Sequence, residues 1–156
     1  MEGPVRTVSF EALAAQVGQE IGVSAWTRID QPMIDAFAKL TGDSHFIHVD
    51  PARAAAVLPS KGTIAHGFLT LSLIAPTGFE LLVARVQLKS VVNYGLEKVR
   101  FVTPVRSGKR VRNRIKLAAV EHKGSNRYLV TTENSIEIEG ETRPALTASA
   151  LAIFMA

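Results

Sequence analysis

Residues 67–84, GFLTLSLIAPTGFELLVA, form the most apolar stretch of the chain. The stretch is nearly as long as a membrane span, but Pro76 and Glu80 interrupt it. Thr70 and Ser72 are the only polar residues of its first two turns, so the segment is apolar on nearly every side. A helix of this kind belongs in the middle of a fold. We therefore predict a long core helix that the other elements must cover.

After this segment the pattern changes to that of strands. Four stretches are rich in β-branched residues or alternate with a period of two, at residues 86–102, 110–122, 127–139 and 145–155. KGSN and EGET provide short turns, so antiparallel pairing in sequence order is expected. Gly95 is expected to form a bulge or bend in the first strand.

The N-terminal half is mainly helical in pattern. Ser9 can cap a short helix, and residues 22–29 alternate loosely like a strand. Asp30 can cap a second helix that ends at Gly42, and a third helix starts at Asp50 and Pro51. Helices followed by a strand meander indicate an α+β protein. The prediction is one domain over residues 1–156, with a curved antiparallel sheet wrapped around a long buried central helix.

Composition limits the classes of protein. The chain has 156 residues, 47% apolar and 21% charged, which fits a globular domain with a sizeable core. It has no cysteine, so disulfides and thiolate metal sites are excluded. The N-terminus shows no signal-peptide pattern. A cytoplasmic location, without membrane attachment, is expected.

Positive charge is concentrated in one part of the chain. Residues 98–116 contain eight Lys or Arg and no acid, and between residues 110 and 117 basic and mostly apolar side chains alternate. This is typical of a strand with one solvated face. An anionic ligand such as a phosphate-bearing cofactor remains an alternative. Nucleic acid is disfavoured because no aromatic residues alternate with the basic ones.

The sequence TGDSHFIHVD, residues 41–50, connects two predicted helices and carries two aspartates and two histidines. Asp43 and His48 could point at one site, hold a water molecule and exchange protons with it. They could equally be a turn-forming aspartate and a structural histidine. The spacing of His45 and His48, with Asp43 and Asp50 near, matches no strong metal pattern, so no metal is expected.

TIAHGFLTLS, residues 63–72, places Gly67 at the start of the apolar helix. The first N–H groups of a helix lack partners within it and carry partial positive charge. Gly67 could therefore stabilise a carbonyl oxygen that gains negative charge. His66 is expected to be structural.

Taken together, these segments resemble the MaoC-like family, which includes (R)-specific enoyl-CoA hydratases with a hot-dog fold. FAKLTGDSHFIHVDPARAA, residues 37–55, matches the first family motif, IAHGF the second, and NYGLEKVRFVTPVRSGKRVR, residues 93–112, the third. The resemblance is greatest to the nodulation-protein-N-like branch. His45-Phe46 stands where many members have Asn-Pro, whose asparagine orients the aspartate.

The resemblance implies reversible syn hydration of a trans-2-enoyl-CoA to a (3R)-3-hydroxyacyl-CoA, as in fatty acid metabolism. Asp43 and His48 would be catalytic, and Gly67 would polarise the thioester carbonyl. His45, His66, Asn93, Lys98 and Arg100 are further candidates for the binding site, and Arg106 and Arg110 join Lys98 and Arg100 as candidates for the CoA phosphates. No cofactor is implied, since the CoA arrives with the substrate, and a homodimer is expected. A hot-dog acyl-CoA thioesterase and a non-catalytic acyl-CoA or partner-binding module are the alternatives.

Overall fold

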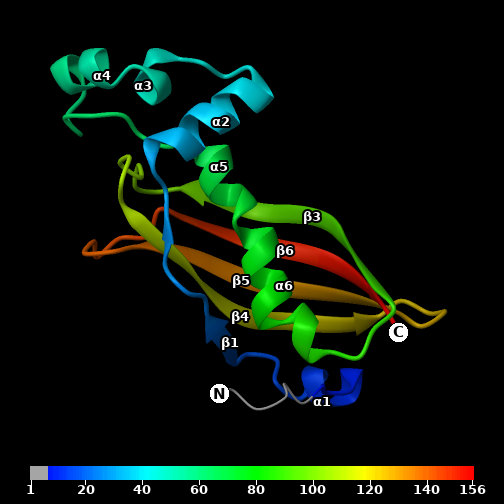
Figure 1. Ribbon diagram of the computed structural model, residues 1–156. Coiled ribbons are helices and arrows are strands. Elements are labelled where there is room, and N and C mark those ends of the chain that lie inside the picture. Colours follow the sequence, from blue (N-terminus) through cyan, green and yellow to red (C-terminus); the bar gives the residue numbers. More distant parts are fainter. Residues whose placement is uncertain (1–6) are drawn as a thin grey trace, which may run out of the picture.

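A computed structural model describes residues 7–156, and its centre is one antiparallel sheet in the order β1-β4-β5-β6-β3, with β2 beside β4 (Figure 1). The strands are β1 Glu20–Val23, β2 Thr27–Arg28, β3 Ser90–Phe101, β4 Arg110–His122, β5 Arg127–Ile138 and β6 Leu146–Met155. The helices are α1 Phe10–Ala14, α2 Gln31–Thr41, α3 Phe46–Val49, α4 Pro51–Val57, α5 Gly67–Ser72, α6 Ile74–Leu81 and the short 3₁₀ turn η1 Val83–Arg85.

The apolar segment forms the helix that crosses one face of the sheet, as α5, α6 and η1 in succession (Figure 1). Leu69 and Ile74 belong to a core that also contains Val111 and Leu146 of the sheet. The predicted central helix is thus confirmed, although its outer side is not covered. A single sheet covers only one side of the helix, and Phe68 is 69% exposed. By length and composition this segment could cross a membrane, but here it packs on the sheet as the core helix.

All strand pairs are antiparallel, but β3 does not pair with the next strand in sequence. It pairs with β6 at the opposite side of the sheet from β4. The expectation of pairing in sequence order is therefore wrong for this strand. Residues 102–109 between β3 and β4 are not a tight turn. They are held by the segment before α5, through Ala65 N–H to Val105 O (2.8 Å) and Ser107 N–H to Thr63 O (3.0 Å).

β3 has two irregularities. One lies between Asn93 and Gly95, which confirms the bulge expected at Gly95. The other lies between Glu97 and Arg100, where Lys98 has a φ of 52°. An extra residue at such a point changes which side chains face the helix. The strand is also the free edge of the sheet, and most of its residues are exposed.

α2, α3 and α4 form a separate helical layer beyond one end of the sheet (Figure 1). Their boundaries agree with the capping residues read from the sequence. Asp30 accepts a hydrogen bond from Met33 N–H at 3.1 Å, and Gly42 ends α2 with a left-handed φ of 82°. Asp50 caps α4, and Pro51 is its first residue.

Removing the cap of α2 is expected to weaken the helix that leads to Asp43. Asp30→Ala should lower the free energy of unfolding by about 1 kcal/mol, because Met33 N–H loses its acceptor. Asp30→Asn keeps an acceptor and is the matched control. Urea denaturation measures both values, and equal stability of the two variants would contradict a capping role.

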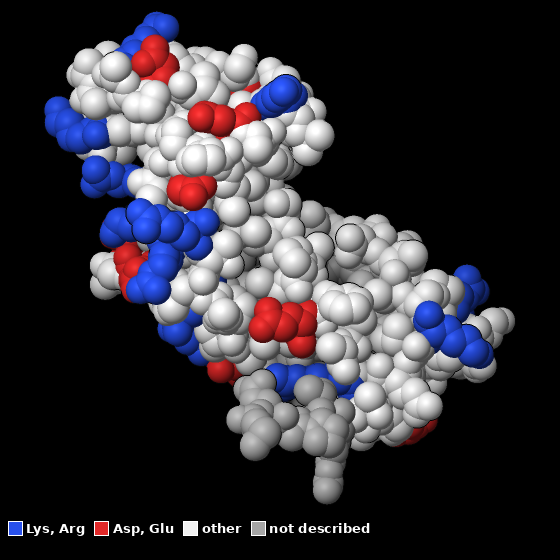
Figure 2. Space-filling model, in the orientation of Figure 1, with Lys and Arg blue, Asp and Glu red and all other residues white. Residues whose placement is uncertain are grey.

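The second half of the basic run, from Arg110 onward, lies in β4. Arg110 pairs with Glu139, Arg112 and Arg114 both pair with Glu137, and Lys116 lies opposite Glu133. These pairs form a ladder on the face of the sheet away from the helix. Seen from the helix side, charge lies mainly along the margins, and the surface over β3 and the central helix is mostly uncharged (Figure 2). The solvated strand face is thus the best explanation for these residues.

Candidate active site

Asp43, His48 and His66 lie together where the helical layer meets the N-terminus of α5. One carboxylate oxygen of Asp43 and one ring nitrogen from each histidine are within 4.8 Å of one another. Asp43 follows the left-handed Gly42 and is exposed, whereas His48 is 8% and His66 3% exposed. The structure therefore brings together the pair singled out in the sequence and adds His66 to it.

The protonation of His48 is defined by its backbone partner. Its Nδ1 lies 2.7 Å from the carbonyl oxygen of Ile64. Because a carbonyl only accepts hydrogen bonds, Nδ1 carries the proton and the neutral ring has its lone pair on Nε2. A neutral Nε2 can accept a proton from water. This hydrogen-bond partner could not be read from the sequence around His48, because Ile64 is 16 residues away.

Burial lowers the pKa of His48 below its ordinary value. The hydrogen bond to Ile64 raises this pKa. Among the neighbouring charges, His66 lowers it, Asp43 raises it and His45 lowers it. The net effect favours the neutral ring, which is the form a general base requires.

This pKa shift makes stability depend on pH. The unfolded chain binds the His48 proton more readily than the folded one, so the free energy of unfolding should fall as the pH drops below the ordinary histidine pKa of about 6.5. His48→Asn keeps a donor for Ile64 but does not titrate. We expect its melting temperature to change less than that of the wild type between about pH 7.5 and pH 5.5. Equal changes in the two proteins would contradict the shift.

His66 lies directly before α5 and contacts both members of the pair. Its Nε2 donates to the carbonyl oxygen of Asp43 at 2.9 Å. Its ring stacks on that of His48, with centroids 3.8 Å apart and planes 25° from parallel. Phe37 of α2 lies 5.1 Å from the same ring. The Nδ1 atom of His66 is buried and has no hydrogen-bond partner among the described residues.

Gly67 is the first residue of α5 and borders a hollow of about 440 Å³. His48 borders the same hollow. The need for glycine is steric, because a Cβ at this position would lie 2.8 Å from Cε1 of Phe101. Phe68 and Phe101 both border the hollow, with ring centroids 5.8 Å apart. Neither aromatic residue was singled out from the sequence, since each needs a long-range contact to be noticed.

A larger hollow of about 740 Å³ lies between the central helix and strands β3, β5 and β6. Phe68 borders both hollows. Asn93 borders this larger one and not the hollow of His48. The lining is mostly apolar, so this space suits a hydrocarbon chain.

The other candidates from the sequence lie outside the cluster of Asp43, His48 and His66. His45 is exposed at the start of α3, 4.7 Å from the ring of Phe46. Lys98 borders a shallow hollow with Arg114 and Lys116 on the opposite face of the sheet. The Nη1 atom of Arg100 donates a hydrogen bond to the carbonyl oxygen of Val99.

The two remaining phosphate candidates differ from each other. Arg110 is engaged by Glu139. Arg106 is exposed and lies in the loop that pairs with Ile64. Arg100 and Arg106 each adjoin a residue that borders the hollow of His48, and of these two Arg106 is the one that also pairs with Ile64.

Gln31 supports the site and was missed in the sequence. Its Nε2 donates to the carbonyl oxygen of His48 at 2.7 Å and to Asp35 at 2.8 Å. Its Oε1 accepts from the hydroxyl of Thr63 at 2.5 Å. The side chain thereby joins α2, α3 and the segment before α5. No local pattern marks it, because a glutamine early in a helix is commonplace.

Asp43, His48 and His66 carry donor atoms of the types that bind metal ions. Three donor atoms within 4.8 Å are close enough for one ion. A ring nitrogen binds a metal along its lone pair, in the plane of the ring. Because the rings of His48 and His66 are stacked with planes 25° from parallel, their lone pairs lie in two nearly parallel planes and are poorly placed to meet at one ion. The geometry is therefore better suited to proton transfer.

Comparison with known proteins identifies the class to which this fold and site belong. The MaoC-like domain matches residues 12–139, and the chain belongs to the MaoC-like family. Nodulation protein N of Rhizobium leguminosarum bv. viciae is 45% identical over 146 residues, covering 94% of this chain and 91% of that protein. The 3-hydroxyacyl-thioester dehydratase Z of Mycobacterium tuberculosis is 42% identical, covering 95% of this chain and 97% of that protein.

The structural comparison confirms the hot-dog fold. An (R)-hydratase of Pseudomonas aeruginosa superposes with a TM-score of 0.72 at 23% identity, over 89% of this chain and 81% of that one. The resemblance read from the sequence is confirmed, including the relation to nodulation protein N. Together, the family and the dehydratase relative support a dehydratase or hydratase.

Proposed function

We propose that this protein is an (R)-specific enoyl-CoA hydratase that interconverts trans-2-enoyl-CoA and (3R)-3-hydroxyacyl-CoA. The observation that supports the proposal most directly is the convergence of Asp43 and a neutral, buried His48, with His48 in the wall of a hollow that begins at Gly67. The dehydratase relative supports the substrate class. No metal or redox cofactor is required for this reaction.

In the proposed reaction, Asp43 and His48 hold a water molecule, and one of them takes its proton as the oxygen adds to the β-carbon. The electrons move onto the thioester oxygen, where Gly67 N–H would stabilise the charge. A proton then reaches the α-carbon on the same face. The two groups lie so close that they are best treated as a coupled pair rather than as separate acid and base.

The two hollows suggest where the substrate lies. The thioester would occupy the smaller one, between His48 and Phe101, and a longer acyl chain would extend past Phe68 into the larger one. Arg106 is the candidate for a CoA phosphate, because its loop pairs with the segment that holds His48. Acyl-CoA thioesters are thus the proposed partners.

The decisive experiment follows the absorbance of the conjugated thioester with enoyl-CoA of short, medium and long chains. Loss of absorbance without release of free thiol is expected. Release of thiol would instead indicate the thioesterase alternative. Binding of acyl-CoA without any turnover would indicate a non-catalytic binding module.

A homodimer is proposed on the basis of the free edge of β3. Tyr94 and Leu96 of this strand are 67% and 48% exposed, an unusual amount of apolar surface for an unpaired edge. Pairing with a second copy would cover it. Light scattering after size exclusion should give twice the mass of the chain, and a monomer at micromolar concentration would oppose the proposal.

A further inference from the structure

We propose that His66 is a positioning residue, which holds the Asp43 backbone with one side of its ring and supports the ring of His48 with its face. This inference rests on the proposed function, because it gives His66 a part in the same reaction. The sequence led us to expect a purely structural role for His66. The role proposed here is different, because His66 sets the geometry of the acid–base pair.

The first observation is the hydrogen bond from His66 Nε2 to Asp43 O, which joins residues 23 apart in sequence. Among the described residues, it is the one hydrogen bond to Asp43 from outside its own loop. Within the loop, Asp43 N–H reaches only Thr41 Oγ1, at 3.4 Å. His66 itself is fixed by α5, where Thr70 N–H donates to its carbonyl oxygen. The bond therefore connects an exposed loop to the central helix.

The second observation is the stack of His66 on His48. The hydrogen bond from His48 Nδ1 to Ile64 O fixes the direction of the His48 ring in its plane. The ring of His66 limits movement perpendicular to that plane. The two contacts hold His48 in the orientation that leaves Nε2 free, while the same His66 ring holds Asp43.

The third observation is the buried Nδ1 of His66 that has no partner among residues 7–156. An unpaired buried acceptor is unfavourable, so an apolar side chain would suit this position better if filling space were the only requirement. The imidazole has one property that such a side chain lacks, namely the Nε2–H donor to Asp43. The position therefore favours a residue that is both flat and a donor.

Two variants separate the two contacts. His66→Phe keeps a flat ring against His48 but loses the donor to Asp43, and His66→Gln keeps a donor of similar reach but loses the ring. We expect His66→Phe to lower kcat by about 10²-fold with little change in KM, because small displacements of reacting groups have effects of this size. His66→Gln should recover a substantial part of the rate. His122→Phe, at an exposed histidine, is the matched control.

Hydrogen–deuterium exchange of a peptide covering residues 41–46 provides a readout that needs no turnover. Exchange should be faster in His66→Phe than in the wild type and His66→Gln. If the wild type hydrates no enoyl-CoA, the proposed function fails, and the exchange experiment still decides whether His66 holds the Asp43 loop. The inference would be overturned if His66→Phe had the same kcat and the same exchange rate as the wild type. It would also be overturned if both variants lost the same amount of activity and lost thermal stability in parallel. If phenylalanine prevents folding, His66→Leu takes its place.

Discussion

Replacing Asp43 or His48 by asparagine is expected to lower the rate of enoyl-CoA hydration by about 10²–10⁴-fold each, the usual contribution of positioned acid–base groups. Asp43→Asn keeps the size of the side chain but removes the charge that faces the two histidines. His48→Asn keeps a donor for Ile64 O and removes the basic Nε2. The rate is measured from the absorbance of the conjugated thioester.

The controls come from the same part of the chain. Asp50→Asn should be nearly silent, because asparagine caps α4 as well as aspartate does. A coupled pair also predicts that the double variant is little worse than either single one. Rates within a factor of about three of the wild type in both single variants would exclude acid–base catalysis by these residues.

Gly67→Ala is expected to lower kcat by about 10²-fold, the size associated with a displaced donor to a developing oxyanion. The added Cβ would lie 2.8 Å from the ring of Phe101, so either the ring or the start of α5 must move. Overpacking of this kind should also lower the free energy of unfolding by about 1–3 kcal/mol. Steady-state kinetics and urea denaturation give the two quantities.

Two further variants test the cause. Gly78→Ala adds the same methyl group to α6, where nothing lies within 4 Å of the new Cβ. Because Gly78 borders the larger hollow, this control is assayed with short-chain enoyl-CoA, and it should preserve that activity. Gly67→Ala combined with Phe101→Leu removes much of the clash and should recover part of the lost rate. A Gly67→Ala protein as active as the wild type would show that the position of this backbone amide is not important.

The parts of the structure that the sequence predicted well are those set by local chemistry. Asp30 and Asp50 each accept a hydrogen bond from an N–H three residues ahead, and Gly42 has the left-handed backbone expected of it. The convergence of Asp43 and His48 is in the same category, because five residues in a tight connection cannot separate far. Leu40, near the end of α2, is apolar but 83% exposed, since the helix end projects beyond the core.

The parts that could not be predicted depend on contacts between distant segments. β3 lies beside β6 because of the path that residues 102–109 take. The sequence of β3 itself contains no pattern that predicts this path. His66 reaches Asp43 across 23 residues, and Phe101 reaches Gly67 across the fold. Lys98 has a positive φ in a bulge, so simple alternation could not predict the face on which it lies.

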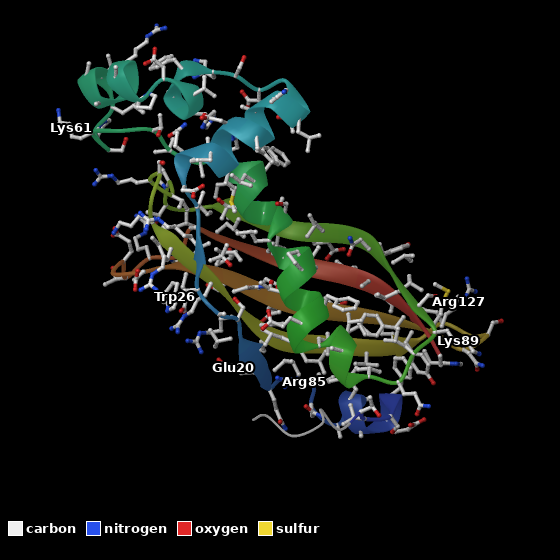
Figure 3. The ribbon with its side chains drawn as sticks, viewed as in Figure 1. Glu20, Trp26, Lys61, Arg85, Lys89 and Arg127 are labelled. Atoms are coloured by element: carbon white, nitrogen blue, oxygen red, sulfur yellow. The ribbon has the colours of Figure 1, made fainter. Side chains whose placement is uncertain are left out.

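Among the described residues, α3 and α4 contribute nothing to the two apolar cores, and they are held by bonds such as Ile64 N–H to Ile47 O at 3.0 Å, whereas α2 is anchored by the buried Ile34. The exposed Lys61, in the loop after α4, extends away from the strands (Figure 3). Regions with few buried contacts open at a lower free-energy cost than a sheet core. Low concentrations of urea should therefore abolish turnover while the circular dichroism of the strands persists. Loss of activity and unfolding of the sheet would then be two separate transitions.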